Sequence, residues 1–130
     1  TTPMTTTPVV DNHRALDSLL ARLLPAVLAR QGDLLGVKDA KTGRYVHANA
    51  ALARALGRDE AELVGRSDAE LFDADLAPAL RLADQKALTQ DQPVLSEHRL
   101  TVGGQRHEYS VMRLVAEADG QRLLASVWTD

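Results

Sequence analysis

Three short helical stretches, each preceded by a helix cap, follow one another within residues 49–72 and constrain the fold most. Asn49, Asp59 and Ser67 are residue types whose side chains accept hydrogen bonds from the first free amides of a helix. Ser67 and Glu70 form a complete Ser-x-x-Glu capping box. For Asn49, its place before an Ala- and Leu-rich run favours a cap over a ligand contact. This pattern predicts a cluster of short helices.

Hairpin signals on both sides of this cluster predict an antiparallel sheet. Gly-containing turns separate strand-like runs, and a longer helix with Asp75 as its cap occupies the middle of the chain. The expected strands are residues 34–38, 44–48, 94–102, 105–116 and 122–129. Because strands and helices occur in groups along the chain and do not alternate one by one, we expect an α+β domain with the helices on one face.

The N-terminal third divides into a tail and a flanking helix. Residues 1–10 are Thr- and Pro-rich and are expected to be a disordered lead-in, residues 11–32 to form a helix, and residues 33–130 the main domain. Pro25 should kink this helix or start a second one. Its apolar stripe can cover its own sheet or meet the same helix of a second copy, and we expect a homodimer. Four stripe positions have the spacing of paired helices: Leu16, Leu20, Leu23 and Val27.

Composition excludes several classes of function. The net charge is −3, so neither nucleic acid nor direct membrane contact is expected. The chain has no cysteine, which excludes disulfides, thiol nucleophiles and cysteine-ligated zinc. No apolar run approaches the roughly 20 residues of a membrane span. A cysteine-free domain is compatible with either side of a membrane. We expect a cytoplasmic location.

Residues 37–72 resemble the opening half of PAS domains, through Lys38-Asp39, Gly43, Asn49, Gly57, Glu62-Leu63 and Gly65. Residues 92–114 resemble the third and fourth strands of that family. The resemblance implies a PAS fold, with a five-stranded antiparallel sheet in the order 2-1-5-4-3. It also implies a bacterial sensory or dimerisation module joined to a C-terminal effector. The expected effector is a histidine kinase or a GGDEF/EAL protein, with a transcription regulator as the alternative.

The resemblance also implies an interior cavity between the long helix and the sheet. An unidentified small organic ligand there would have Asp84 to orient a polar head group. Alternatively, Asp84 is solvated or pairs with Arg81 or Lys86, and the core is filled without a ligand. The candidate lining residues are Leu76, Leu80, Asp84 and Leu88 of the helix, with Tyr45, His47, Tyr109, Val111, Met112 and Trp128 of the sheet.

No cofactor or catalytic site is evident. The four histidines lack metal-ligand spacing. The resemblance argues against haem, because residues 76–90 hold no axial histidine, and cysteinyl-flavin chemistry lacks its cysteine. Ser96 and His98 share a strand face, but no acid is placed to orient the histidine. We therefore expect a non-enzymatic domain, either a sensor or a ligand-free scaffold.

Overall fold

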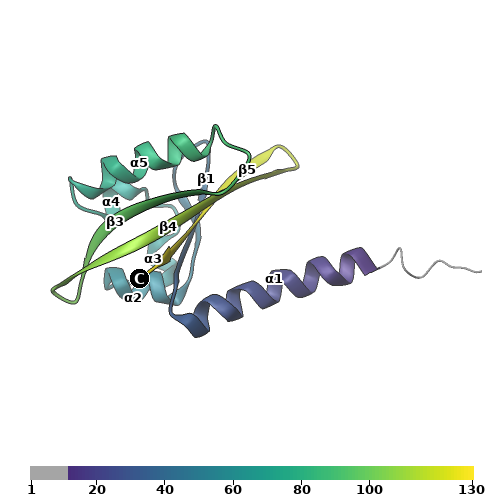
Figure 1. The fold of residues 1–130 in the computed structure, drawn as a ribbon, viewed down its shortest axis with the longest axis horizontal. Helices are drawn as coiled ribbons and strands as arrows, with labels where there is room; N and C mark the ends of the chain where they lie inside the picture. The colour runs from purple at the N-terminus through teal and green to yellow at the C-terminus, as the bar shows by residue number, and fades with distance from the viewer. Residues whose placement is uncertain (1–11) are drawn as a thin grey trace, which may run out of the picture.

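The computed structural model describes residues 12–130 and shows an α+β domain built on one five-stranded sheet (Figure 1). Every neighbouring strand pair is antiparallel, and the order is β2-β1-β5-β4-β3. The expected fold class and strand order are therefore confirmed. The expected lead-in, residues 1–10, lies outside the described residues. In chain order the elements are α1 (Asn12–Gln31), β1 (Leu34–Asp39), β2 (Tyr45–Ala48), α2 (Ala50–Leu56), α3 (Glu60–Leu63), α4 (Asp68–Leu71), α5 (Leu76–Ala87), β3 (Val94–Val102), β4 (Gln105–Ala118) and β5 (Gln121–Thr129).

Helix caps fix the positions of α2 to α5. The Asn49 side chain accepts a hydrogen bond from the Leu52 amide at 2.9 Å. The same oxygen accepts from the Leu35 amide at 3.1 Å, so one residue begins α2 and also ties it to β1. Glu70 accepts from the Ser67 amide at 3.4 Å. Asp75 is the N-cap residue of α5, as expected, but its side chain makes no capping hydrogen bond; the Asp73 carboxylate instead accepts from the Leu76 amide at 2.8 Å.

The inner face of the sheet carries the core, and strand alternation decides which residues lie there. On β4 the odd-numbered positions Tyr109, Val111 and Arg113 are buried, whereas Met112 and Leu114 are exposed on the outer face. Gly36 of β1 lies under the ring of Tyr45, where an added Cβ would meet the ring at 2.6 Å. The apolar core groups Tyr45, Tyr109 and Val111 with residues of α2 and α5.

Helix α1 is one uninterrupted helix that includes Pro25, so no second helix begins at that proline. It extends away from the sheet (Figure 1), and of its apolar stripe only Leu28 is buried. The alternative in which the stripe covers its own sheet is therefore wrong. Exposed stripe residues are Leu16, Leu19, Leu20, Leu23, Leu24 and Val27. Within residues 12–130, no helix is long and apolar enough to cross a membrane.

Candidate functional site

Four charged residues are drawn into the interior between the sheet and the helices, and with their polar neighbours they form what we call the charge network. Lys38 of β1 and Arg113 of β4 are 3% and 1% exposed. Their acidic partners come from the helical layer: Asp68 opens α4, and Asp84 lies on α5. Because a buried charge needs a partner, these contacts hold helices and sheet in register. The remaining members are Tyr45, Ser96 and His98.

Lys38 lies at the centre of the network. Its Nζ contacts Oδ2 of Asp68 at 2.7 Å and also Oδ2 of Asp84. The Tyr45 hydroxyl donates to the other Asp68 oxygen at 2.6 Å, and Lys38 Nζ lies 5.5 Å from the centre of the Tyr45 ring. Burial, followed by the negative charge of Asp68, raises the pKa of Tyr45 well above its ordinary value, which keeps its hydroxyl protonated as a donor.

Arg113 extends the network across the inner face of the sheet to β3. Its Nε donates to Oδ1 of Asp84 at 2.7 Å, and its Nη1 donates to Ser96 Oγ at 2.6 Å. Ser96 Oγ in turn lies 2.8 Å from Nε2 of His98. Burial, and then the positive charge of Arg113, lowers the pKa of His98, which favours a neutral ring. Two cations thus balance two carboxylates.

A groove of about 610 Å³ opens onto this network between α5, α4 and the β1–β2 turn, and we call it the α5 groove. Lys38, Asp68 and Asp84 lie along it. Arg81 and Lys41 are exposed cations among its lining residues. Apolar residues also line it: Ala77, Pro78, Leu88 and Leu124. Buried charges beside a partly apolar hollow are the arrangement in which proteins hold small polar molecules.

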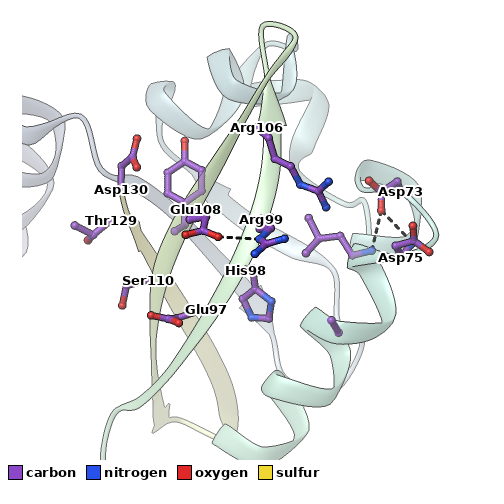
Figure 2. Close-up of a pocket in the computed structure, with 13 residues that line it drawn as sticks. Asp73, Asp75, Glu97, His98, Arg99, Arg106, Glu108, Ser110, Thr129 and Asp130 are labelled. Atoms are coloured by element: carbon purple, nitrogen blue, oxygen red, sulfur yellow. Dashed lines mark hydrogen bonds and ion pairs between the residues drawn. The ribbon is translucent and has the colours of Figure 1, made fainter.

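A larger hollow of about 730 Å³ lies at the β3–β4 end of the sheet, near the start of α5 (Figure 2). Figure 2 shows that its side chains lie on both sides of these strands: His98 faces α5, whereas Glu97 points the other way. Neighbouring strand residues on opposite faces cannot line one enclosed interior. Arg99 and Glu108 in this hollow form an exposed pair at 2.8 Å. We therefore place the candidate site at the smaller α5 groove.

An aromatic cluster fills the interior beyond the charge network. The Trp128 ring stacks on Phe72 with centroids 5.8 Å apart, and Tyr109 meets it edge-on at 5.7 Å. His98 touches both regions, because its ring also lies 6.1 Å from that of Trp128. Trp128 Nε1 is buried and has no hydrogen-bond partner among the described residues. The cluster packs this end of the domain with rings.

The structure separates the sequence-predicted site residues into interior and outer sets. Leu76, Leu80, Tyr45, Tyr109, Val111 and Trp128 are buried, while Asp84 and Leu88 line the α5 groove. The predictions for His47 and Met112 are wrong: both are exposed, Met112 because even positions of β4 face outward. Asp84 pairs with Lys38 and Arg113, not with Arg81 or Lys86.

Sequence reasoning missed Lys38, Asp68 and Arg113 as site residues. A signal did exist for two of them. Lys38 follows Leu34 and Gly36 at inward positions of β1, and Arg113 follows Tyr109 and Val111 on β4. A cation that continues an inward-facing series on a strand must find a buried partner.

Metal-ligating groups and nucleophile pairs are the arrangements relevant to catalysis among the described residues. Among residues 12–130 no group of His, Asp or Glu side chains is arranged to hold a metal ion. Ser96 and His98 are within hydrogen-bond distance, but Arg113 donates to the same Ser96 oxygen. Burial, and then the positive charge of Arg113, lowers the pKa of His98, so the pair is poorly suited to activating a nucleophile.

Comparison with known proteins places the fold in a family. Residues 28–129 match the profile of the PAS fold. The PAS domain of an HTR-like protein from Haloarcula marismortui has 24% identity and a TM-score of 0.61, over 92% of this chain and 98% of that one. The PAS domain of Bordetella pertussis BvgS has 15% identity and a TM-score of 0.66, over 85% of each chain.

A third similar structure is the PAS domain of nitrogen regulation protein NR(II) from Vibrio parahaemolyticus. It has 18% identity and a TM-score of 0.63, over 83% of this chain and 97% of that one. A search of curated proteins found no match to this chain. The profile match extends from the end of α1 to the last residue of β5, so it includes every strand and the whole charge network. The chain therefore belongs to the PAS fold family.

Proposed function

We propose that this chain is a sensory input domain that detects a small organic molecule in the α5 groove. The observation that carries the proposal is the placement of Lys38, Asp68 and Asp84 along a groove that also has apolar walls. A few fixed polar groups give such a site its selectivity. A PAS domain from a two-component sensor histidine kinase is among the similar structures, which supports a role in signalling.

Signalling would require two conformations of the domain that bind the ligand with different affinities. A ligand shifts a conformational equilibrium only by its difference in affinity for the two conformations. Lys38 lies on β1, which pairs with β5 along its length. A ligand that moves Lys38 therefore acts on the strand that leads towards residue 130. The effector we propose is a C-terminal histidine kinase or cyclic-dinucleotide enzyme domain in the cytoplasm, with a transcription regulator as the alternative.

Native mass spectrometry of the purified chain tests this function. We expect a non-covalent small molecule to travel with the folded chain and to be lost on denaturation. If the molecule is lost during purification, a thermal-shift screen of a small-molecule library identifies compounds that bind. The sensory proposal is contradicted if the purified chain carries no small molecule and no library compound shifts its thermal unfolding midpoint.

The exposed face of α1 favours a second function, assembly of two copies without a ligand. Six large apolar side chains on one helix are 39–60% exposed, and a contiguous apolar surface of this kind usually meets a partner. We expect a dimer held by the α1 stripe. Light scattering of Leu20→Glu and Leu23→Glu variants should report monomers, whereas Ala21→Glu, at an exposed position off the stripe, should leave the dimer intact.

A further inference from the structure

Asp84 is the one member of the charge network that α5 contributes, and it neutralises two cations fixed on the sheet. Its two oxygens are used separately: Oδ1 accepts from Arg113 Nε at 2.7 Å, and Oδ2 contacts Lys38 Nζ. The cations cannot easily move towards other partners, because Lys38 and Arg113 are almost wholly buried. The carboxylate is the more accessible partner, since the Asp84 side chain is 16% exposed and lines the α5 groove.

We propose that Asp84 is a built-in stand-in for the ligand, and that the α5 groove takes a small organic carboxylate that competes with Asp84 for Lys38 and Arg113. This inference rests on the proposed sensory function and names the chemical class of its ligand. Two cations arranged around one carboxylate form a site for the same group presented by another molecule. The walls at Ala77, Pro78, Leu88 and Leu124 suit a short hydrocarbon body.

Displacement of Asp84 gives the ligand a direct effect on the fold. When an external carboxylate takes the cations, α5 loses its ionic tie to β1 and β4, while α4 keeps its tie through Asp68 and Lys38. The competition also sets the affinity. If Asp84 occupies the cations most of the time, the apparent affinity for an external ligand is the intrinsic affinity multiplied by the fraction of time the cations are free.

The test titrates propionate into the isotopically labelled wild-type chain and follows backbone amide shifts, with propionamide as the matched neutral probe and chloride holding ionic strength constant. We expect saturable shifts around Lys38 and along α5 with propionate and none with propionamide. In Asp84→Asn the competitor is removed, and Lys38, Arg113 and Asp68 leave one net positive charge. Affinity for propionate should rise about tenfold or more if Asp84 occupies the cations at least nine-tenths of the time.

Two variants locate and control the effect. Asp91→Asn removes an exposed carboxylate outside the network and should leave the affinity unchanged. Lys41→Gln with Arg81→Gln removes the exposed groove cations and should retain most of the binding. Loss of binding in that double variant would show a surface site and overturn the proposal.

The remaining outcomes of the titrations also support or overturn the inference. Equal binding of propionate and propionamide would overturn the carboxylate assignment while leaving a sensory groove. No saturable shift with either probe, in wild type and in Asp84→Asn, would overturn the inference, and the independent library screen would still test the broader function. If Asp84→Asn does not fold without propionate, the wild-type titration and the Lys41→Gln/Arg81→Gln variant are sufficient to support or overturn the inference.

Discussion

The two ends of the inner sheet face both carry buried side chains, but they are held together by different interactions. At one end, where Leu34 pairs with Trp128, the interior is filled by stacked rings. At the other, where Lys38 pairs with Leu124, it is filled by ion pairs. Rings are stabilised by burial and contact, which many apolar side chains can supply. Buried charges are stabilised only while each keeps its partner, so the charged end should tolerate substitution far less.

The largest expected effect comes from breaking the network at its centre. Lys38→Met keeps much of the side-chain volume but leaves Asp68 without its cation and Asp84 with Arg113 alone. Leaving a buried charge without its partner costs about 3–5 kcal/mol. Urea unfolding followed by the fluorescence of Trp128, the single tryptophan, measures the change.

An exposed pair provides the control for this prediction. Arg99 and Glu108 are 2.8 Å apart, but their side chains are 61% and 73% exposed. Arg99→Met should cost less than about 1 kcal/mol, because water screens the pair. If Lys38→Met proves no more costly than Arg99→Met, the two ends of the interior do not differ as we argue.

The next effect concerns the seam between the two ends, where Gly36 lies under Tyr45. An alanine there would place its Cβ 2.6 Å from the ring, and the ring is tethered by the 2.6 Å hydrogen bond to Asp68. Gly→Ala inside a strand ordinarily stabilises by reducing the freedom of the unfolded chain. We expect Gly36→Ala instead to destabilise by about 1–3 kcal/mol, through overpacking.

A double variant separates overpacking from other causes. In a Tyr45→Leu background the 2.6 Å contact with the ring is gone and the tight contact with Leu52 at 3.2 Å remains, so Gly36→Ala should cost less than in the wild type. Equal cost in both backgrounds would mean that the ring is not what the methyl group meets. The same urea titration gives both values.

A milder change tests the aromatic end. Phe72→Leu removes the ring stacked on Trp128 at 5.8 Å and replaces it with an aliphatic side chain of related size. The expected cost is about 0.5–1.5 kcal/mol, the usual contribution of one aromatic pair beyond its buried area. The near-ultraviolet circular dichroism of Trp128 should change while the cooperativity of unfolding is kept. A loss as large as that of Lys38→Met would remove the contrast in tolerance.

The sequence was enough for the element order and the α+β architecture because local signals mark their ends. Caps such as Asn49 and turns such as Gly103-Gly104 act over a few residues and need no knowledge of the rest of the chain. The strand order and the family came from resemblance to the PAS pattern. The sequence does not determine which face of β4 points inward, since Val111 and Met112 are both apolar.

The charge network could not be found in the same way because its four charged members come from four elements far apart in the chain. Lys38 and Asp68 are 30 positions apart, and Lys38 and Asp84 are 46. Taken locally, Asp84 has nearer candidate partners in Arg81 and Lys86, and those are the partners that the ligand-free alternative named. Only the pairing of strands brings Arg113 towards it. Long-range ion pairs are set by topology, and their local sequence signal is weak.

The smallest expected effect lies at His98, which contacts both ends. Burial and the charge of Arg113 lower its pKa in the folded state below the ordinary value of 6.5. The unfolded chain therefore binds more protons than the folded one as the pH falls below about 6.5. The stability that the neutral ring contributes is fully present above that pH and is lost as the pH falls towards the folded-state pKa.

His98→Gln isolates this contribution, because glutamine does not titrate and can still bond to Ser96. The free energy of unfolding should drop between pH 7.5 and pH 5.5 in the wild type, and the drop should be smaller in His98→Gln (both pH values are chosen to lie about 1 unit on either side of the ordinary pKa). The difference should be modest, since the ring is only partly buried and water screens its charge. Identical pH profiles would mean that protonated His98 is tolerated beside Arg113, and that the boundary between the charged and aromatic ends admits a third cation.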